Sequence, residues 1–445
     1  MLRVEDAIRG KSGKGKTLPK KKKKVRESRV LDYEKVIERF TRLCPKYLNL
    51  SLLIAVLGLA SFGVAMVYSA SHYNAQYYFG NRYHFFTSQM IGLVLGIVML
   101  AFTYFLDYKI YARMKWLVLG SAVILLLLVF VPGIGISRLG ATRWIGVGGF
   151  TMQPSELAKF AFIIFAASVA SQKKSGKKKI IDQRISKNSK PSWRSKIAGK
   201  ADEFTSLETK EAKQLSVKQL ALILAVGGGM CGLILLQPNL SIVMTLGATM
   251  FVCLFLFGIK LKHLGILILP VLVIIPVMLV AEPYRIRRLV AFVDPWATPR
   301  GEGFQLIQSL YSLGNGGLFG RGFLNSTQSH MFLPFSESDF IFSIIGEEFG
   351  LVGTLIFIFV LGFIVYNIFK VGRNCRELFG KYLCFGIGTL VFIQSALNIA
   401  VVTGSIPPTG LPLPFISFGG TSLAVFMAGI GIVLNVHKNN LRRNN

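Results

Sequence analysis

Charged residues are scarce in this chain. Only 16% of its 445 residues are charged and 52% are hydrophobic, whereas soluble domains carry about 25% charged residues. This composition excludes an ordinary soluble domain and is typical of membrane proteins.

Acidic residues are the scarcest charged class, with 21 Asp and Glu against 51 Lys and Arg and a net charge of +30. In a soluble protein such an excess would suggest a nucleic-acid partner. Here 16 basic residues lie in residues 1–48 and 14 lie in residues 172–219, beside apolar runs. This placement is typical of cytoplasmic flanks that obey the positive-inside rule, so we expect contact with the membrane and not with nucleic acid.

Cysteine is also rare. The five cysteines show no Cys-x-x-Cys spacing, so neither disulfides nor a metal site is indicated, and we interpret them as small packing residues. No cleavable signal peptide is expected, because the first apolar run starts near residue 49, follows a long basic segment and is too long for one. The first helix is therefore expected to remain in the membrane.

Long apolar runs are abundant. Ten runs of about 17 to 25 residues predict an all-α polytopic membrane protein with ten transmembrane helices. With both termini in the cytoplasm, the basic connecting segments all fall inside. A single kinked helix across Gln237-Pro238-Asn239 is the competing interpretation, and it would reverse the side of every later segment. The predicted spans are 49–70, 86–106, 114–132, 155–171, 218–236, 239–258, 263–281, 341–370, 382–403 and 414–436.

This topology divides the chain into three parts: a basic cytoplasmic segment (1–48), the membrane domain (49–437) and a cytoplasmic tail (438–445). Within the membrane domain, residues 172–217 form a Lys-rich cytoplasmic insert that we expect to be disordered. It is either a solvated linker or a site for a cytoplasmic partner or anionic lipid. Residues 282–340 form a long extracytoplasmic loop with enough apolar residues to fold against the membrane.

The stretch "SESDFIF" (336–342) places two carboxylates, Glu337 and Asp339, directly before an apolar run. We expect the eighth span to begin at 336–338 with Asp339 in its first turn, where capping of free N–H groups is the simplest explanation. Charged groups inside a span are costly and usually face a partner or a wet cavity. Such residues predict a polar chamber that opens outward, lined by Gln153, Ser155, Glu156, Glu347 and Glu348.

The stretch "TMQPSELAKF" (151–160) predicts the start of another span. Pro154 suits the first helical position, and Glu156 suits the first turn, where the helix dipole favours negative charge. Lys159 follows three residues later on the same face. The pair is either a structural ion pair or part of the wall of the polar chamber.

Two features of the outer loops suggest ligand binding. Arg285, Arg287 and Arg288 place three guanidinium groups within four residues, which suits either phosphate recognition or general contact with lipid headgroups. "GNGGLFGRG" (314–322) lacks the context of a nucleotide-binding loop, so we interpret it as a structural bend close to a ligand. The Pro- and Gly-rich segment 404–422 is expected to form a rigid wall of the chamber.

Five motifs stand in order along the membrane domain: "ATRWIGVGGFTMQPSELAK", "DPWATPRGEGFQLIQSL", "LGNGGLFGRG", "SDFIFSIIGEEFGLVG" and "TGLPLPFISFGGTS". They resemble those of SEDS proteins, the cell-wall polymerases that include FtsW, RodA and SpoVE. The resemblance covers roughly residues 50–437. "YRIRR" followed by "DPW" is more similar to the cell-division branch, FtsW, than to the elongation branch, RodA.

The resemblance implies a ten-helix fold and peptidoglycan glycosyltransfer from lipid II on the outer face of the cytoplasmic membrane. It implies undecaprenyl-diphosphate-linked glycan as the growing substrate and a class B penicillin-binding protein as the crosslinking partner. Membership of the cell-division branch would add other divisome proteins as partners and the division septum as the location.

The resemblance also assigns roles to residues. It makes Asp339 the catalytic carboxylate, either as a general base or as a ligand of a divalent cation, Mg²⁺ or Mn²⁺. As a hypothesis, neutralisation of the diphosphate is expected from Arg285, Arg287 or Arg288, or alternatively from Lys159, which is paired with Glu156. A helix-start carboxylate would be a poor base unless an apolar surround raised its pKa. The candidates for substrate binding are Arg285, Arg287, Arg288, Lys159, Glu156 and Glu337.

The sequence departs from the family pattern at two places. The family commonly has Leu-Pro-Glu where this chain has Leu333-Pro334-Phe335. The loop carboxylate is therefore missing, although Glu337 could substitute for it. It also commonly has Gln-Pro-Asp where this chain has Gln237-Pro238-Asn239. The change from Asp to Asn removes a charge from the turn between the fifth and sixth spans. The alternatives are a RodA-like elongation polymerase, a lipid II flippase or other transporter, and a noncatalytic scaffold. No internal repeat typical of transporters is evident.

Overall fold

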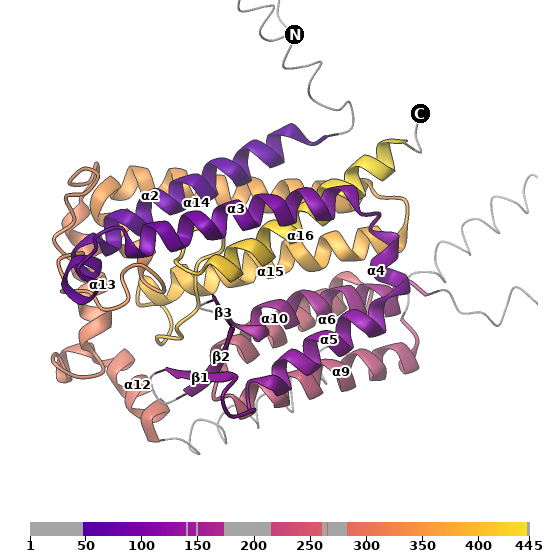
Figure 1. Cartoon of the computed structure of the whole chain (residues 1–445), viewed down its shortest axis with the longest axis horizontal. Helices are drawn as coiled ribbons and strands as arrows, with labels where there is room; N and C mark the ends of the chain where they lie inside the picture. The colour runs from indigo at the N-terminus through magenta and orange to yellow at the C-terminus, as the bar shows by residue number, and fades with distance from the viewer. Residues whose placement is uncertain are drawn as a thin grey trace, which may run out of the picture. The chain divides into compact units, whose positions relative to one another are not determined.

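The computed structural model describes residues 48–138, 141–147, 150–172, 215–259, 265 and 283–442, and Ser51–Asn445 form one compact unit. The unit is built mainly from helices (Figure 1). They are α2 (Leu50–Phe79), α3 (His84–Phe105), α4 (Lys109–Arg113), α5 (Lys115–Leu128), α6 (Pro154–Ala170), α9 (Val217–Leu236), α10 (Leu240–Leu256), α12 (Pro283–Val293), a 3-10 turn η1 (Pro295–Ala297), α13 (Phe304–Gly316), α14 (Ile341–Asn374), α15 (Leu378–Val402) and α16 (Gly420–Arg442).

Nine of the ten predicted spans coincide with helices. Among the described residues, six helices are long and apolar enough to cross a membrane, namely α2, α3, α9, α14, α15 and α16. The helices α5 and α10 are apolar but shorter, and α6 has 17 residues and is buried on nearly every face. The predicted span 263–281, the basic segment 1–47 and most of the 172–217 insert lie outside the described residues.

Two groups of helices meet at α15. In the first, α15 contacts α14 and α16, and α16 packs along α3; in the second, α6 contacts α5, α9 and α10 (Figure 1). The two groups join because α15 also packs on α6 and α10. Close approach depends on small residues, as is usual in membranes: a Cβ on Gly92 of α3 would lie 2.4 Å from the Cα of Gly420 on α16.

A small antiparallel sheet interrupts the all-helical expectation. Its strands β1 (Gly135–Arg138), β2 (Ala141–Val147) and β3 (Phe150–Met152) are ordered β1-β2-β3. Ile145 of β2 pairs with Gly135 on one side and with Met152 on the other. Thr, Trp, Ile and Val in β2 favour strands. The three strands are short, however, so the sequence alone does not distinguish them from a connecting segment.

Helix α14 is broken at Gly350, which has φ 66° and ψ −166°. There the segment 317–322 replaces two of its backbone hydrogen bonds. The N–H groups of Leu351 and Val352 donate to the carbonyls of residues 317 and 318, at 2.9 and 3.1 Å. The carbonyls of Glu347 and Glu348, which those groups would otherwise use, accept instead from the N–H groups of residues 321 and 322, both at 2.9 Å. The exchange keeps these four backbone groups of α14 paired at the break.

Two expected helix starts were wrong. Helix α14 begins at Ile341, the first residue of the predicted span 341–370, and not at 336–338 as the cap residues suggested, and α16 begins at Gly420, not at 414. In both cases the residues before the helix bond to other parts of the chain. The tail predicted from residue 438 onwards continues α16 as far as Arg442.

Candidate active site

Asp339 lies in the turn before α14 and is half-buried. The N-cap of α14 is Phe340, and no side chain caps this helix end. The predicted capping role is therefore wrong. The turn is held from α15, because Asn398 Nδ2 donates to the backbone oxygens of Asp339 and Leu411 at 2.7 and 2.6 Å. Gly410 covers the carboxylate: a Cβ there would lie 3.2 Å from Asp339 Oδ2.

Three charged side chains act on this carboxylate. Burial and, to a smaller extent, the negative charge of Glu337 raise the pKa of Asp339 from 3.8 to about 6, while Arg288 and Arg143 oppose this rise. The apolar surround thus has the effect that a base requires. A carboxyl group with a pKa of about 6 is ionised at neutral pH and can still accept a proton.

Glu337 is held on the side of α2. Burial raises its pKa, and hydrogen bonds from Ser336 and from Asn74 of α2 lower it. Ser336 Oγ also donates to the carbonyl of Ala70, at 2.9 Å. These bonds attach the turn before α14 to the C-terminal part of α2.

Arg143 is a site residue that the sequence analysis did not single out. It lies on β2, and its guanidinium donates to the carbonyl of Gln237 at 3.3 Å and to that of Pro238. The turn between α9 and α10 is closed by Asn239, whose Oδ1 accepts from the N–H of Ile242 at 3.4 Å. The departure from Gln-Pro-Asp therefore keeps an N-cap. The available signal was that Arg138 and Arg143 are the only charged residues in the sequence of the outer segment 133–154.

The three predicted arginines belong to α12. Arg285 and Arg288 are three residues apart and share a helix face, whereas the spacing of Arg287 puts it on a different face. Arg288 forms an ion pair with Glu302 at 3.6 Å and is partly exposed. Its positive charge lowers the pKa of Asp339.

The pair Glu156 and Lys159 is completely buried, with side chains 2% and 0% exposed. Lys159 Nζ lies 2.8 Å from Glu156 Oε1 and 2.6 Å from Gln394 Oε1 of α15. Ser422 of α16 donates to the other oxygen of Glu156, at 3.1 Å. Gln394 Nε2 donates in turn to the carbonyl of Pro412, at 2.9 Å. The pair joins α6, α15 and α16 and supports the loop that covers Asp339, which favours the structural interpretation.

The predicted polar chamber is not a common space for the acidic residues. Glu347 is fully buried and accepts from Ser326 Oγ at 2.6 Å, from Thr327 Oγ1 at 2.7 Å and from the N–H groups of residues 327 and 328. Glu348 is also buried and accepts from Ser69 of α2. Ser155 is buried and Gln153 is half-buried at the start of α6. Each acid therefore holds neighbouring segments together, and the two on α14 fix the loop before Asp339.

The backbone near Asp339 is strained. Met331 and Phe335 have φ values of 68° and 56°, and Phe415 in the facing loop has 68°. Bulky residues rarely adopt this left-handed conformation, which concentrates at functional sites. The two loops are tied together, since the N–H of Phe418 donates to the carbonyl of Glu337 at 2.9 Å.

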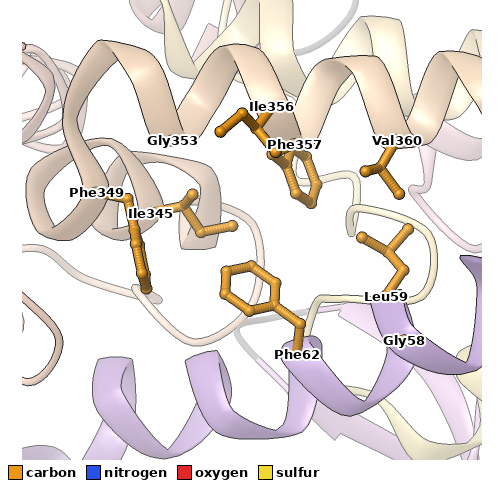
Figure 2. A pocket seen from close by; sticks show the side chains of 9 residues that line it. All are labelled: Gly58, Leu59, Phe62, Ile345, Phe349, Gly353, Ile356, Phe357 and Val360. Atoms are coloured by element: carbon orange, nitrogen blue, oxygen red, sulfur yellow. The ribbon is translucent and has the colours of Figure 1, made fainter. Parts of the chain in front are cut away.

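An apolar cavity of about 280 Å³ opens between α2 and α14. Figure 2 shows Phe62, Leu59 and side chains of α14 pointing into it. Its lining has no charged group, so it differs from the predicted polar chamber. Its location is suited to hydrocarbon chains of the bilayer.

The residues around Asp339 fit a resident metal ion poorly. Asp339 and Glu337 supply two carboxylates, and the charges of Arg143 and Arg288 would repel a cation bound there. Within the described part of the chain, no group of three or more His, Cys, Asp or Glu side chains is arranged to hold a metal.

Comparisons with known proteins agree with this fold and these motifs. A family model described as "Cell cycle protein" for FtsW, RodA and SpoVE matches residues 50–442. The chain is 34% identical to stage V sporulation protein E of Bacillus subtilis over 390 residues, which cover 88% of this chain and 97% of that protein. It is 35% identical over 388 residues to the probable peptidoglycan glycosyltransferase FtsW of Geobacter metallireducens, covering 87% and 94%.

Solved structures show the same arrangement. A chain from a study titled "Structural coordination of polymerization and crosslinking by a peptidoglycan synthase complex" superposes with a TM-score of 0.67 at 25% identity, covering 88% of this chain and 98% of that one. The rod shape determining protein RodA of Thermus thermophilus gives a TM-score of 0.58 at 23% identity, covering 88% and 97%. The family model and the sequence matches show that the chain belongs to the FtsW/RodA/SpoVE family of cell cycle proteins, the SEDS family, and the solved structures agree with its fold.

Proposed function

We propose that this chain polymerises lipid II into glycan strands on the outer face of the cytoplasmic membrane, with Asp339 as the general base. The observation that carries the proposal is the half-buried Asp339 carboxyl, whose pKa of about 6 is set by burial, Glu337 and two arginines. Glycosyltransferase activity is supported by relatives that bear this name and match the chain over nearly their whole length.

The chemistry suits this surround. As the 4-hydroxyl of lipid II attacks the anomeric carbon of the growing glycan, its proton passes to Asp339. The new O–C bond forms while the bond to undecaprenyl diphosphate breaks, and the electron pair leaves with the diphosphate. Arg143 and Arg288 are placed to stabilise the departing negative charge. No step requires a cation at Asp339.

The topology predicted from the sequence supports an outward-facing site. If ten spans cross the membrane with both termini in the cytoplasm, the turn before α14 and the loop 404–419 lie outside, together with α12 and the sheet. The same topology places the basic segments 107–115 and 370–381 inside. Both substrates keep lipid tails, and the apolar cavity beside α14 offers space for hydrocarbon near the membrane.

A crosslinking partner is part of the proposal. A structural relative comes from a peptidoglycan synthase complex that coordinates polymerization and crosslinking. We therefore infer that a class B penicillin-binding protein accompanies this chain. The "YRIRR" and "DPW" motifs favour the FtsW branch, with other divisome proteins and a septal location, over a RodA-like role in elongation.

The test is polymerisation of lipid II by the purified chain in proteoliposomes, with lipid II confined to the outer leaflet. A polymerase makes glycan strands without translocation, whereas a flippase or a scaffold makes none. Asp339→Asn should abolish strand formation while retaining the fold by thermal melting. Full polymerisation by this variant would remove Asp339 from the mechanism.

A further inference from the structure

Two chemically different surroundings meet at the turn that carries Glu337 and Asp339. Asp339 feels the charges of Arg143 on β2 and Arg288 on α12. Glu337 instead has hydrogen bonds from neutral groups, one of them the Asn74 amide of α2. The turn therefore has two arginine charges acting at Asp339 and neutral groups bonding Glu337.

The C-terminal part of α2 adds aromatic rings to these neutral groups. The ring of Tyr73 lies next to Asn74 in sequence, and its centroid is 3.7 Å from that of His330 and 4.0 Å from that of His72. Tyr73 remains 41% exposed. His330 belongs to the exposed end of the segment that Glu347 holds in place. This neighbourhood is referred to here as the Tyr73 platform: Tyr73, Asn74, His330 and Glu337.

Aromatic residues at the end of a membrane helix are often simple interfacial anchors. Tyr77 and Tyr78 fit that description, because they are 71% and 68% exposed and contact each other. Tyr73 differs because it packs against a histidine from a distant segment and adjoins the residue that bonds Glu337. An exposed aromatic ring, next in sequence to an amide that bonds a carboxyl group, supplies the groups that bind a polar, partly apolar ring such as a sugar.

We propose that the Tyr73 platform binds the acceptor sugar of lipid II, the ring that carries the attacking hydroxyl. This inference rests on the proposed function. The attacking oxygen and the leaving diphosphate lie on opposite sides of the anomeric carbon in a direct displacement. The cationic groups suit the diphosphate, so the acceptor occupies the side of Asp339 that continues towards Glu337 and α2. There its hydroxyl transfers a proton to Asp339 as the O–C bond forms.

The experiment separates the two substrates. A lipid II analogue without the 4-hydroxyl can only donate, and one with carbon in place of the anomeric oxygen can only accept, so together they give a single coupling reaction. Tyr73→Ala should raise KM for the acceptor about fivefold, as expected for the loss of one stacking contact, and leave KM for the donor and kcat unchanged. Tyr73→Phe, which keeps the ring, should resemble the wild type.

Tyr77→Ala is the matched control on the same helix, and it should change neither KM. If Tyr73→Ala melts at a lower temperature than the wild type, His330→Ala replaces it, with the same expected rise in KM for the acceptor alone. An unchanged acceptor KM, or an equal change in both KM values, overturns the platform. Absence of coupling by the wild-type chain would instead overturn the proposed function and the platform with it.

Discussion

The rate of polymerisation should fall as the pH is lowered through about 6, because the base must be ionised to accept a proton. With the pKa of Asp339 at about 6, the ionised fraction is about 90% at pH 7 and about 10% at pH 5, a tenfold loss in kcat/KM. An aspartate at its ordinary value of 3.8 would keep more than about 90% of its activity at pH 5. The profile therefore distinguishes the buried base from an exposed one.

Two variants fix the sign of this effect. Glu337→Gln removes a negative charge that raises the pKa of Asp339, so the midpoint of the profile should move to lower pH. Arg288→Gln removes a positive charge that lowers it, so the midpoint should move to higher pH. Titration of the lipid diphosphate is common to all three proteins and does not shift between them. A flat profile between pH 5 and 7, or shifts of the same sign in both variants, would refute the assignment of the base.

Three further predictions concern stability in detergent, measured by thermal melting. Gly350→Ala should lower the melting temperature strongly, because the added Cβ would lie 2.3 Å from the backbone nitrogen of residue 320 and the residue has a φ of 66°. Gly362→Ala on the same helix is the control, and it should be tolerated because the added Cβ would meet open space. Lys159→Met should destabilise the fold by roughly 3–5 kcal/mol, because it leaves Glu156 buried without its cation, and adding Glu156→Gln should recover part of the loss. Asp339→Asn should have a higher melting temperature than the wild type above pH 6, because the folded wild type then holds a costly buried charge. Below about pH 3.8 the two melting temperatures should be equal, because Asp339 is protonated in both the folded and the unfolded wild type. A lower melting temperature of the variant at pH 8 would contradict the raised pKa.

Local sequence was sufficient to locate most of the helices. A run of apolar residues must be buried in lipid and must satisfy its own backbone, so nine predicted spans coincide with helices. Pro154 at the first position of α6 and the ion pair of Glu156 with Lys159 followed from the same short-range rules. The motif around Asp339 also identified the residue on which the site is centred.

Long-range contacts decided what short-range rules could not. The segment before Asp339 has the composition of a helix cap, but bonds from Asn398 of α15 and Asn74 of α2, both distant along the chain, hold it outside the helix and give Asp339 its surround. Arg143 enters the site because a small sheet brings it there, and Gly350 is required because segment 317–322 supplies the hydrogen bonds at that break. Hydrophobicity along the chain thus determined which segments enter the membrane, whereas the pairing of distant polar groups, which no local pattern records, decided the chemistry between them.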